Sequence, residues 1–185
     1  EAGVSALNVL SSRSDVDEER LGLMGFSMGT YWGFRVVAAE QRLKACAFAL
    51  PCWESGMDTI FNMASPTFKL NYMYMSGHDD EDAFDRFMEG LSLEGLEGDI
   101  DCPLMCIAGE DEDLSPLDVT LEVFGRVNQP KSLVLYEGMK HSIDAPYVDH
   151  AADWLCDWLA GRHRKSEKVY VELSGQEIVT PINQT

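Results

Sequence analysis

The chain has 185 residues, 45% of them hydrophobic, and this size and composition predict one globular domain with a substantial core. Its 32 acidic residues against 14 lysines and arginines give a formal net charge of -18, which argues against nucleic acid and membrane partners because both favour basic surfaces. No apolar run is long enough to cross a bilayer, and the five cysteines lack C-x-x-C spacing, so we expect a soluble, cytoplasmic protein without disulfides or a metal site.

The first predicted element is a helix over residues 1–12, where Val4, Leu7 and Leu10 recur at near-helical spacing. A polar turn follows. The chain therefore opens inside a helix, with Glu1 rather than a methionine. We expect it to be the C-terminal part of a longer protein, whose N-terminal region would pair with an otherwise bare sheet edge.

Residues 21–30, LGLMGFSMGT, predict an apolar strand that runs into a G-x-S-x-G turn and then into a helix. The five-residue pattern alone is common by chance in loops. Its setting between a strand and the helix-compatible residues 31–41 predicts a tight corner that exposes Ser27 as a nucleophile. We expect both Gly25 and Gly29 to be needed there, because a Cβ atom would collide with the neighbouring strand or helix.

A helix over residues 30–40 and a strand over 43–50 follow, and the nearly continuous apolar run of the strand favours burial on both faces. Residues 54–101 show no strand pattern. They contain short helices predicted at 57–63 and 82–91, with Pro66 between them. An insertion of this length between two strands predicts a lid or a pocket wall.

Two clusters in the insertion allow a functional interpretation. The first is an aromatic and methionine-rich group that could line a substrate pocket, although such residues more often form ordinary core: Phe68, Leu70, Tyr72, Met73, Tyr74 and Met75. The second, HDDED at residues 78–82, offers possible metal ligands. A solvated acidic helix start is the favoured interpretation, because the helix dipole stabilises carboxylates at an N-terminus.

Candidate catalytic groups return after the next two predicted strands. The strand over residues 100–109 is followed by the acids of residues 110–113, and catalytic groups gather beyond the carboxyl ends of strands in open α/β sheets. A helix over 117–127 and a strand over 132–136 then lead to His141, which among the four histidines alone sits at a strand-to-loop junction. The order serine, acid, histidine predicts His141 as the base and one of the acids as its orienting partner.

The last predicted helix, over residues 145–160, has apolar residues at helical spacing and Gly161 as a C-cap. A tail over 162–185 follows. Residues 168–173 alternate apolar and polar, and 177–181 could pair with them as a hairpin, with a frayed tail as the alternative.

Four segments together resemble the C-terminal catalytic part of an α/β-hydrolase: VDEERLGLMGFSMGTYWGFR, FKLNYMYMSGHDDEDAF, IDCPLMCIAGEDEDLSPL and GMKHSIDAPYVDHAADWL. Within that superfamily, residues 1–161 resemble the FrsA-like esterase group, which includes 2,6-dihydroxypseudooxynicotine hydrolase and fungal hydrolases that shorten polyketide pigment precursors. The resemblance implies an α/β fold, a mostly parallel sheet flanked by helices, with the helical insertion at 54–101 before the acid-bearing strand.

The resemblance also implies roles for individual residues. Ser27 would be the nucleophile, His141 the base, and the backbone N–H of Met28 one donor of the oxyanion hole. Relatives place the acid three residues after the loop glycine, which is Glu112 here, and Asp111 and Asp113 flank it as open alternatives. A second oxyanion donor would come from a loop upstream of this chain.

The implied activity is that of a serine hydrolase without a cofactor. It would cleave an ester, or a C–C bond adjacent to a carbonyl, in a small-molecule acyl or carbonyl substrate through an acyl-enzyme. An acyl transferase of the same fold and a catalytically inactive binding protein are the alternatives. We expect weak or no activity from these residues alone, and the oligomeric state stays open, with a homodimer as one alternative.

Overall fold

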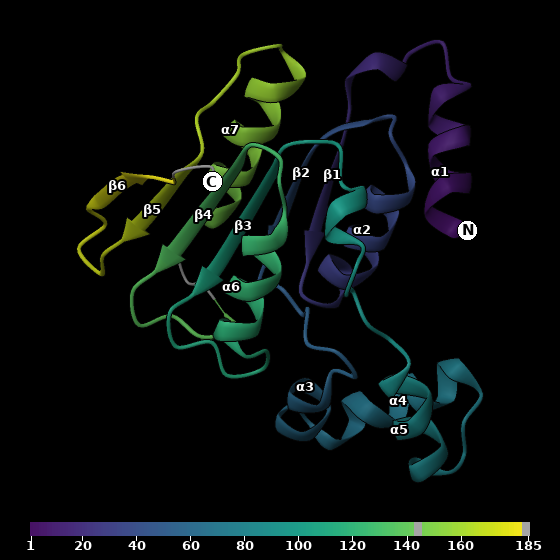
Figure 1. The fold of residues 1–185 in the computed structure, drawn as a ribbon. Coiled ribbons are helices and arrows are strands. Elements are labelled where there is room, and N and C mark those ends of the chain that lie inside the picture. Colours follow the sequence, from purple (N-terminus) through teal and green to yellow (C-terminus); the bar gives the residue numbers. More distant parts are fainter. Residues whose placement is uncertain (143–145, 183–185) are drawn as a thin grey trace.

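The computed structural model of the protein describes residues 1–142 and 146–182 (Figure 1). Its centre is a six-stranded sheet of order β1-β2-β3-β4-β5-β6, in which all neighbours pair in parallel except β5 and β6. The strands are β1 (Leu21–Phe26), β2 (Leu43–Ala49), β3 (Leu104–Gly109), β4 (Lys131–Tyr136), β5 (Glu167–Val171) and β6 (Glu177–Pro181). The helices are α1 (Ala2–Ser11), α2 (Met28–Ala39), α3 (Asp58–Met63), α4 (Pro66–Ser76), α5 (Glu81–Glu89), α6 (Leu117–Arg126) and α7 (Tyr147–Leu159), with short 3₁₀ helices η1 (Glu18–Arg20) and η2 (Glu97–Asp99).

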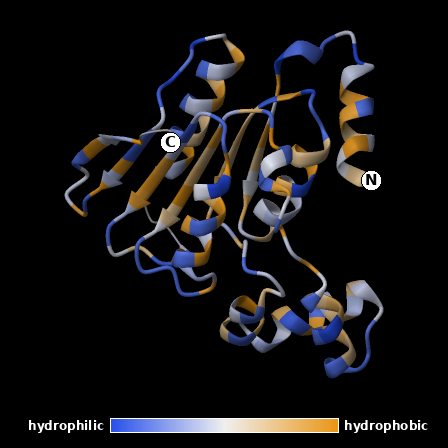
Figure 2. Cartoon of the chain, in the orientation of Figure 1, coloured by the Kyte–Doolittle hydropathy of each residue, from blue (hydrophilic) through white to orange (hydrophobic). Residues whose placement is uncertain are grey.

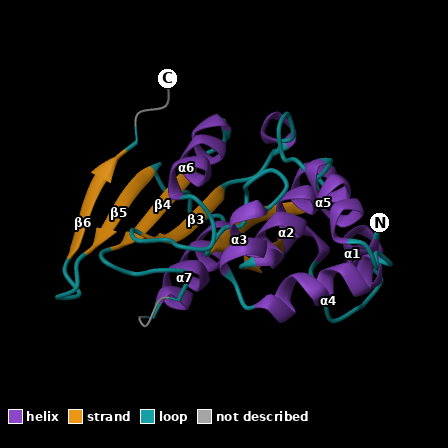
Figure 3. Cartoon of the chain, turned by 90° about the horizontal axis from the view of Figure 1, so that it is seen from below, coloured by secondary structure: helices purple, strands orange, loops and turns teal. Residues whose placement is uncertain are grey.

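Helices cover both faces of the sheet. Alternate residues of β2 supply the two cores: Cys46 and Phe48 belong to the buried cluster that includes residues of α1, α2 and α6, whereas Ala47 and Ala49 belong to the cluster that includes residues of α7. Figure 3 shows α6 and α7 on opposite sides of the strands. The indole N–H of Trp154 on α7 donates to the Cys46 carbonyl at 3.1 Å, so α7 is tied to the sheet by a buried hydrogen bond as well as by apolar contact.

The buried strands follow their apolar sequence, as Figure 2 shows for the centre of the sheet. All six residues of β3 and all six of β4 are buried. This confirms the predicted strands, with two differences in their first residues: β3 begins at Leu104 rather than at residue 100, and β4 begins at Lys131 rather than at residue 132. Pro103 precedes it and has no N–H to donate to the sheet, although its carbonyl accepts from Cys46.

The insertion at 54–101 contains three helices where the sequence predicted two. Pro66 begins the additional helix, α4, because its missing N–H costs nothing in the first turn of a helix. Gly77 ends α4 with a left-handed φ of 74°. The sequence did not predict α4, although Pro66 does lie between the two predicted helices, and the expectation that residues 54–101 contain no strand is confirmed.

Helices α3, α4 and α5 form a lobe beyond the carboxyl ends of the strands (Figure 1). Phe61 lies at its centre, with ring centroids 5.8 Å from Phe68, 5.4 Å from Tyr72 and 5.3 Å from Phe84. Asp80 caps α5 by accepting from the Ala83 N–H at 2.8 Å, which supports the helix-start interpretation of the acidic stretch. The lobe thus has a small aromatic core of its own.

A buried carboxylate fixes the return of the chain from the lobe to the sheet. Glu97 in η2 is 4% exposed and accepts from Arg126 of α6 at 2.8 Å and from the Gly95 N–H at 2.7 Å. Removal of the Glu97 carboxylate would leave the Gly95 N–H without this partner and Arg126 with only its pairing to Glu122, so the contact stabilises the junction that precedes the acid-bearing strand β3.

The C-terminal residues enlarge the sheet. Helix α7 begins at Tyr147, and its predicted first residue, Ala145, lies outside the described residues. Strand β5 pairs in parallel with β4, which the sequence did not predict, and β6 pairs back on β5 as the expected hairpin. Strand β1 lies at the opposite edge. None of the helices within residues 1–142 and 146–182 has the length and apolarity needed to cross a membrane.

Candidate active site

Ser27 occupies the sharp corner between β1 and α2. Its φ of 51° and ψ of -127° are rare for a residue with a side chain, and such a conformation costs about 1–3 kcal/mol. Three hydrogen bonds hold it. The Ser27 N–H donates to the Ala49 carbonyl at 3.0 Å, and the Ser27 carbonyl accepts from the N–H of Thr30 at 2.8 Å and from its hydroxyl at 2.6 Å. Hydrogen bonds to β2 and to α2 therefore fix the strained corner.

The two glycines of the turn differ in what they contribute. A Cβ atom on Gly25 would lie 2.8 Å from the Gly29 carbonyl oxygen and 3.0 Å from the Thr30 Cα atom, so Gly25 is required for the close approach of β1 and α2. A Cβ atom on Gly29 would meet nothing within 4 Å. The expectation that both glycines prevent a collision is therefore wrong for Gly29, because its Cα faces open space.

The Ser27 hydroxyl meets His141, although 114 positions separate them in sequence. The distance from Ser27 Oγ to His141 Nε2 is 2.8 Å. Strand β4 lies three places from β1 in the sheet, and the loop after β4 carries His141 back across the carboxyl ends of the strands to Ser27. The structure thus brings together the two residues that the sequence singled out as nucleophile and base.

Among the three candidate acids, Glu112 contacts the imidazole. Its Oε1 atom lies 2.8 Å from His141 Nδ1 and also accepts from the Leu114 N–H at 3.0 Å. The Glu112 side chain is only 1% exposed, and its Oε2 atom has no hydrogen-bond partner among the described residues. A carboxylate in this position keeps the proton of a neutral imidazole on Nδ1 and leaves Nε2 free to accept from Ser27.

Asp113 and Asp111 hold the histidine loop instead. Asp113 accepts from the His141 backbone N–H at 3.4 Å and pairs with Lys140 at 3.1 Å. Burial raises the pKa of Asp113, but Lys140 and the His141 N–H together hold that pKa below its ordinary value. Asp111 contributes its backbone N–H, which donates to the Met139 carbonyl at 2.8 Å. Neither side chain reaches the imidazole ring through a hydrogen bond in the described part of the chain.

Cys52 is a site residue that the sequence reasoning missed. Its sulfur lies 3.8 Å from Ser27 Oγ, the residue is 1% exposed, and its N–H donates to the Thr30 hydroxyl at 2.9 Å. The spacing of the cysteines bears only on disulfides and metal sites and does not point to Ser27. The usable signal was position: Cys52 follows the carboxyl end of β2, the neighbour of the strand that carries Ser27.

The surroundings of His141 shift its protonation. Burial lowers the pKa of the imidazole, but contacts with Cys52 and Glu112 outweigh burial and raise the pKa of His141 to about 9. A carboxylate partner favours the imidazolium form, which is the form that a general base reaches after it removes a proton. The site is therefore built to stabilise positive charge on His141.

The backbone N–H of Met28 stands next to the nucleophile. Met28 is the first residue of α2, so its N–H has no carbonyl four residues earlier within the helix and lies at the positive end of the helix dipole. Such an N–H suits an oxyanion. Within the described residues, no group of three or more histidine, cysteine and acidic side chains is arranged to hold a metal ion.

The sequence of the chain matches a known protein family. The sequence model described as the prolyl oligopeptidase family matches residues 3–162. No curated protein matches the chain significantly. Among solved structures, 2,6-dihydroxy-pseudo-oxynicotine hydrolase is similar at 22% identity, with a TM-score of 0.73, over 89% of this chain and 48% of that one.

Two further solved structures share the fold. Acetyl xylan esterase 1 from Thermoanaerobacterium sp. is 15% identical with a TM-score of 0.65, over 85% of this chain and 51% of that one. The α/β hydrolase GrgF from Penicillium sp. is 18% identical with a TM-score of 0.61, over 85% and 70%. The chain spans about half the length of the first two proteins. These likenesses show an α/β-hydrolase fold, as the sequence predicted.

Proposed function

Because this chain belongs to the prolyl oligopeptidase family and has an α/β-hydrolase fold, we propose that Ser27, His141 and Glu112 form the catalytic triad of a serine hydrolase. The observation that carries the proposal is the continuous chain of hydrogen bonds between them. Ser27 Oγ lies 2.8 Å from His141 Nε2, and His141 Nδ1 lies 2.8 Å from Glu112 Oε1. This is the arrangement in which a neutral imidazole activates a hydroxyl as a nucleophile.

The reaction follows from where charge develops. His141 Nε2 takes the proton from Ser27 as Oγ attacks a carbonyl carbon, and the Met28 N–H donates to the resulting oxyanion. The imidazolium then gives its proton to the leaving group, and an acyl-serine remains. Water, deprotonated by His141, releases the acid product and restores Ser27. Glu112 keeps the imidazole oriented and stabilises its positive charge throughout.

We propose an ester, or a C–C bond adjacent to a carbonyl, as the bond cleaved. In both cases the leaving group takes the electron pair of the broken bond and a proton from His141: an ester releases an alcohol, and a C–C bond releases a stabilised carbanion that the proton converts to a C–H bond. The similar structures include an esterase and other hydrolases, which supports this class. An acyl transferase would use the same acyl-serine and an alcohol in place of water.

Labelling with a fluorophosphonate tests the proposal, because this reagent phosphonylates a serine only when a base activates it. We expect one adduct, located by peptide mass spectrometry on Ser27, in the wild-type protein and none in Ser27→Ala. Hydrolysis of p-nitrophenyl acetate, which we expect to be weak for these residues alone, should disappear in the same variant. An unlabelled Ser27 in a folded protein would contradict the proposal and favour a binding protein without turnover.

A further inference from the structure

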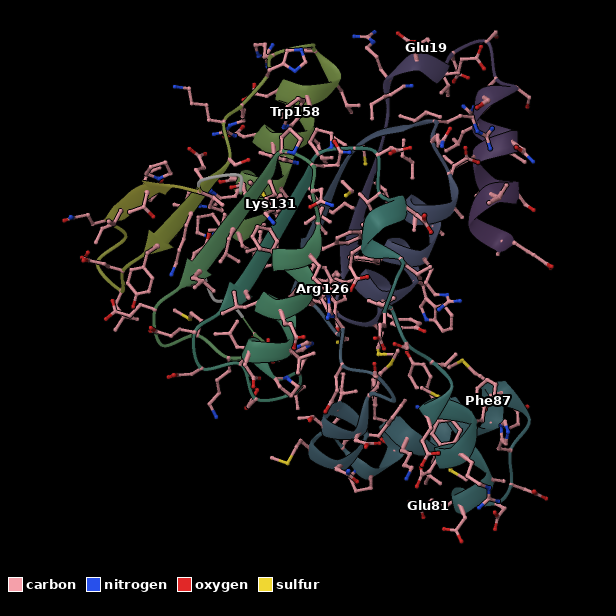
Figure 4. The ribbon with its side chains drawn as sticks, viewed as in Figure 1. Glu19, Glu81, Phe87, Arg126, Lys131 and Trp158 are labelled. Carbon is pink, nitrogen blue, oxygen red and sulfur yellow. The ribbon has the colours of Figure 1, made fainter. Side chains whose placement is uncertain are left out.

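The structure contains an apolar pocket between α2 and the helical lobe. It has a volume of about 300 Å³ and is lined by residues of α2, α4 and α5 and by Leu91 after α5: Met28, Trp32, Tyr72, Met75, Ser76, Phe84, Phe87, Met88 and Leu91. Figure 4 labels Phe87 within the lobe that forms one wall. Of the aromatic and methionine-rich belt considered in the sequence, only Tyr72 and Met75 line this pocket. Met73 is buried at 7% exposure, whereas Tyr74 is 87% exposed.

We propose that this pocket binds the acyl part of the substrate and that this acyl part carries an uncharged aromatic ring. The inference rests on the proposed serine-hydrolase function and adds a substrate class to it. Three observations support it: the continuity of the pocket with Ser27, its place on the acyl side of the nucleophile, and the chemistry of its lining.

The pocket begins beside the nucleophile. Met28 lines it and follows Ser27 directly, so the pocket begins beside the N–H that would bind the oxyanion. Tyr72, a second lining residue, packs against the buried cluster that contains Met28 and Cys52. Cys52 is in turn 3.8 Å from Ser27 Oγ. A group in the pocket can therefore be joined to a carbonyl at Ser27.

The position of His141 distinguishes the acyl side from the leaving-group side. His141 protonates the leaving group, so the leaving group must face the loop after β4. Strand β4 lies three places from β1 in the sheet, whereas the pocket lies over the start of α2, the helix that follows β1. The part of the substrate that stays on Ser27 consequently points toward α2 and the lobe.

The lining favours an aromatic ring over a charged or a small group. Four aromatic side chains and three methionines supply ring faces and polarisable sulfur, both of which attract aromatic rings. None of the described lining residues carries a charge. A charged acyl group would lose its hydration there without compensation. The Tyr72 hydroxyl makes no hydrogen bond within the described residues, so it could donate to one polar substituent.

A series of p-nitrophenyl esters tests the proposal, because the leaving group stays constant while the acyl part changes. The probes are the acetate, the phenylacetate and the hemisuccinate, each rate being divided by the rate of alkaline hydrolysis of that ester. We expect kcat/KM for phenylacetate to exceed that for acetate at least about tenfold, as burial of an apolar group allows, and hemisuccinate to be the poorest substrate.

Two variants on α4 provide a matched comparison. Met75 lines the pocket and Leu70 does not, and both are largely exposed, at 69% and 59%, so tryptophan at either position should leave folding intact. Met75→Trp should lower the ratio of phenylacetate to acetate kcat/KM about tenfold by filling the pocket, whereas Leu70→Trp should leave it as in the wild type. A flat ester series, or equal ratios in the two variants, would overturn the pocket assignment. If Ser27 still takes a fluorophosphonate, only this inference fails; without an adduct, the proposed function fails as well.

Discussion

Gly109 and Met139 pass one another so closely that a Cβ atom on Gly109 would lie 2.1 Å from the Met139 carbonyl oxygen. That oxygen also accepts from the Asp111 N–H at 2.8 Å. The loop that carries Glu112 and the loop that carries His141 are thus joined through their backbones. The absence of a side chain at Gly109 allows the approach, and the approach sets the 2.8 Å distance between Glu112 and His141.

Gly109→Ala should therefore separate the acid from the base. The obstacle is backbone, which cannot rotate away as a side chain would, so we expect a loss of at least about 1–3 kcal/mol in the free energy of unfolding together with a fall in kcat. Urea unfolding and ester hydrolysis measure the two effects. Gly125→Ala is the control, because a Cβ atom there meets nothing within 4 Å and helix α6 should gain stability from it. Wild-type values in Gly109→Ala would refute the coupling of the two loops.

The two glycines beside Ser27 should respond differently to alanine. Gly25→Ala places a Cβ atom 2.8 Å from the Gly29 carbonyl oxygen and should displace the start of α2, with a loss of both stability and Ser27 labelling. Gly29→Ala meets open space and should retain the stability of the wild type, or exceed it slightly, because alanine favours a helix. Thermal unfolding of the two variants decides the point; equal destabilisation would show that the turn is packed differently.

Replacement of the acids tests which of them serves His141. Glu112→Gln preserves the shape of the side chain but removes its charge, and the amide can present its N–H₂ group to Nδ1, which would force the wrong tautomer. We expect kcat to fall by about 10³ to 10⁴ with little change in KM. Asp111→Asn should have no effect, and Asp113→Asn, which weakens the pairing with Lys140, should cost about tenfold at most. A larger loss in Asp113→Asn than in Glu112→Gln would reassign the acid.

The pH dependence should report the surroundings of His141. Burial lowers its pKa, and Cys52 and Glu112 raise it to about 9, so kcat/KM should rise with pH until His141 loses its proton near that value. Cys52→Ala removes one of the raising contacts and should move the midpoint to lower pH. A profile with the same midpoint in both proteins would contradict this role of Cys52.

The same shift has a consequence for stability. The folded pKa of His141 lies above the value of about 6.5 expected in an unfolded chain, so the protonated form favours folding. This contribution is complete below about pH 6.5 and is lost as the pH rises through about 9. Urea unfolding of the wild type against His141→Gln across that range should show the difference between the two proteins shrinking.

The sequence predicted the strands and the order of the candidate catalytic groups because these depend on local patterns. The apolar runs of β2 and β3 and the glycine-flanked Ser27 carry their signal within a few residues. The choice among three adjacent acids could not be made from residue types, since it depends on how the loop after β3 turns toward His141. Cys52 was missed for the same reason: only the parallel pairing of β1 with β2 places it beside Ser27.

Other differences also arise from tertiary contacts. A proline gives the same sequence signal whether it separates two helices or begins one. Here Pro66 begins α4, and the packing of α4 against Phe61 in the lobe favours that helix. The alternating residues of β5 are compatible with an isolated hairpin, and it is the open edge of β4 that gives β5 a parallel partner. Gly29 belongs to the G-x-S-x-G pattern, but the structure has room for a side chain at this position, so the pattern alone does not show that a glycine is needed there.

The most direct test of the account is acid quenching of the protein during turnover of p-nitrophenyl phenylacetate, followed by peptide mass spectrometry. We predict a phenylacetyl adduct on Ser27, a burst of p-nitrophenol equal to the concentration of active sites if deacylation limits turnover, and loss of the adduct in Ser27→Ala and His141→Gln. A burst of p-nitrophenol with no adduct on Ser27, or an undiminished adduct in His141→Gln, would contradict the assignment of these two residues as nucleophile and base.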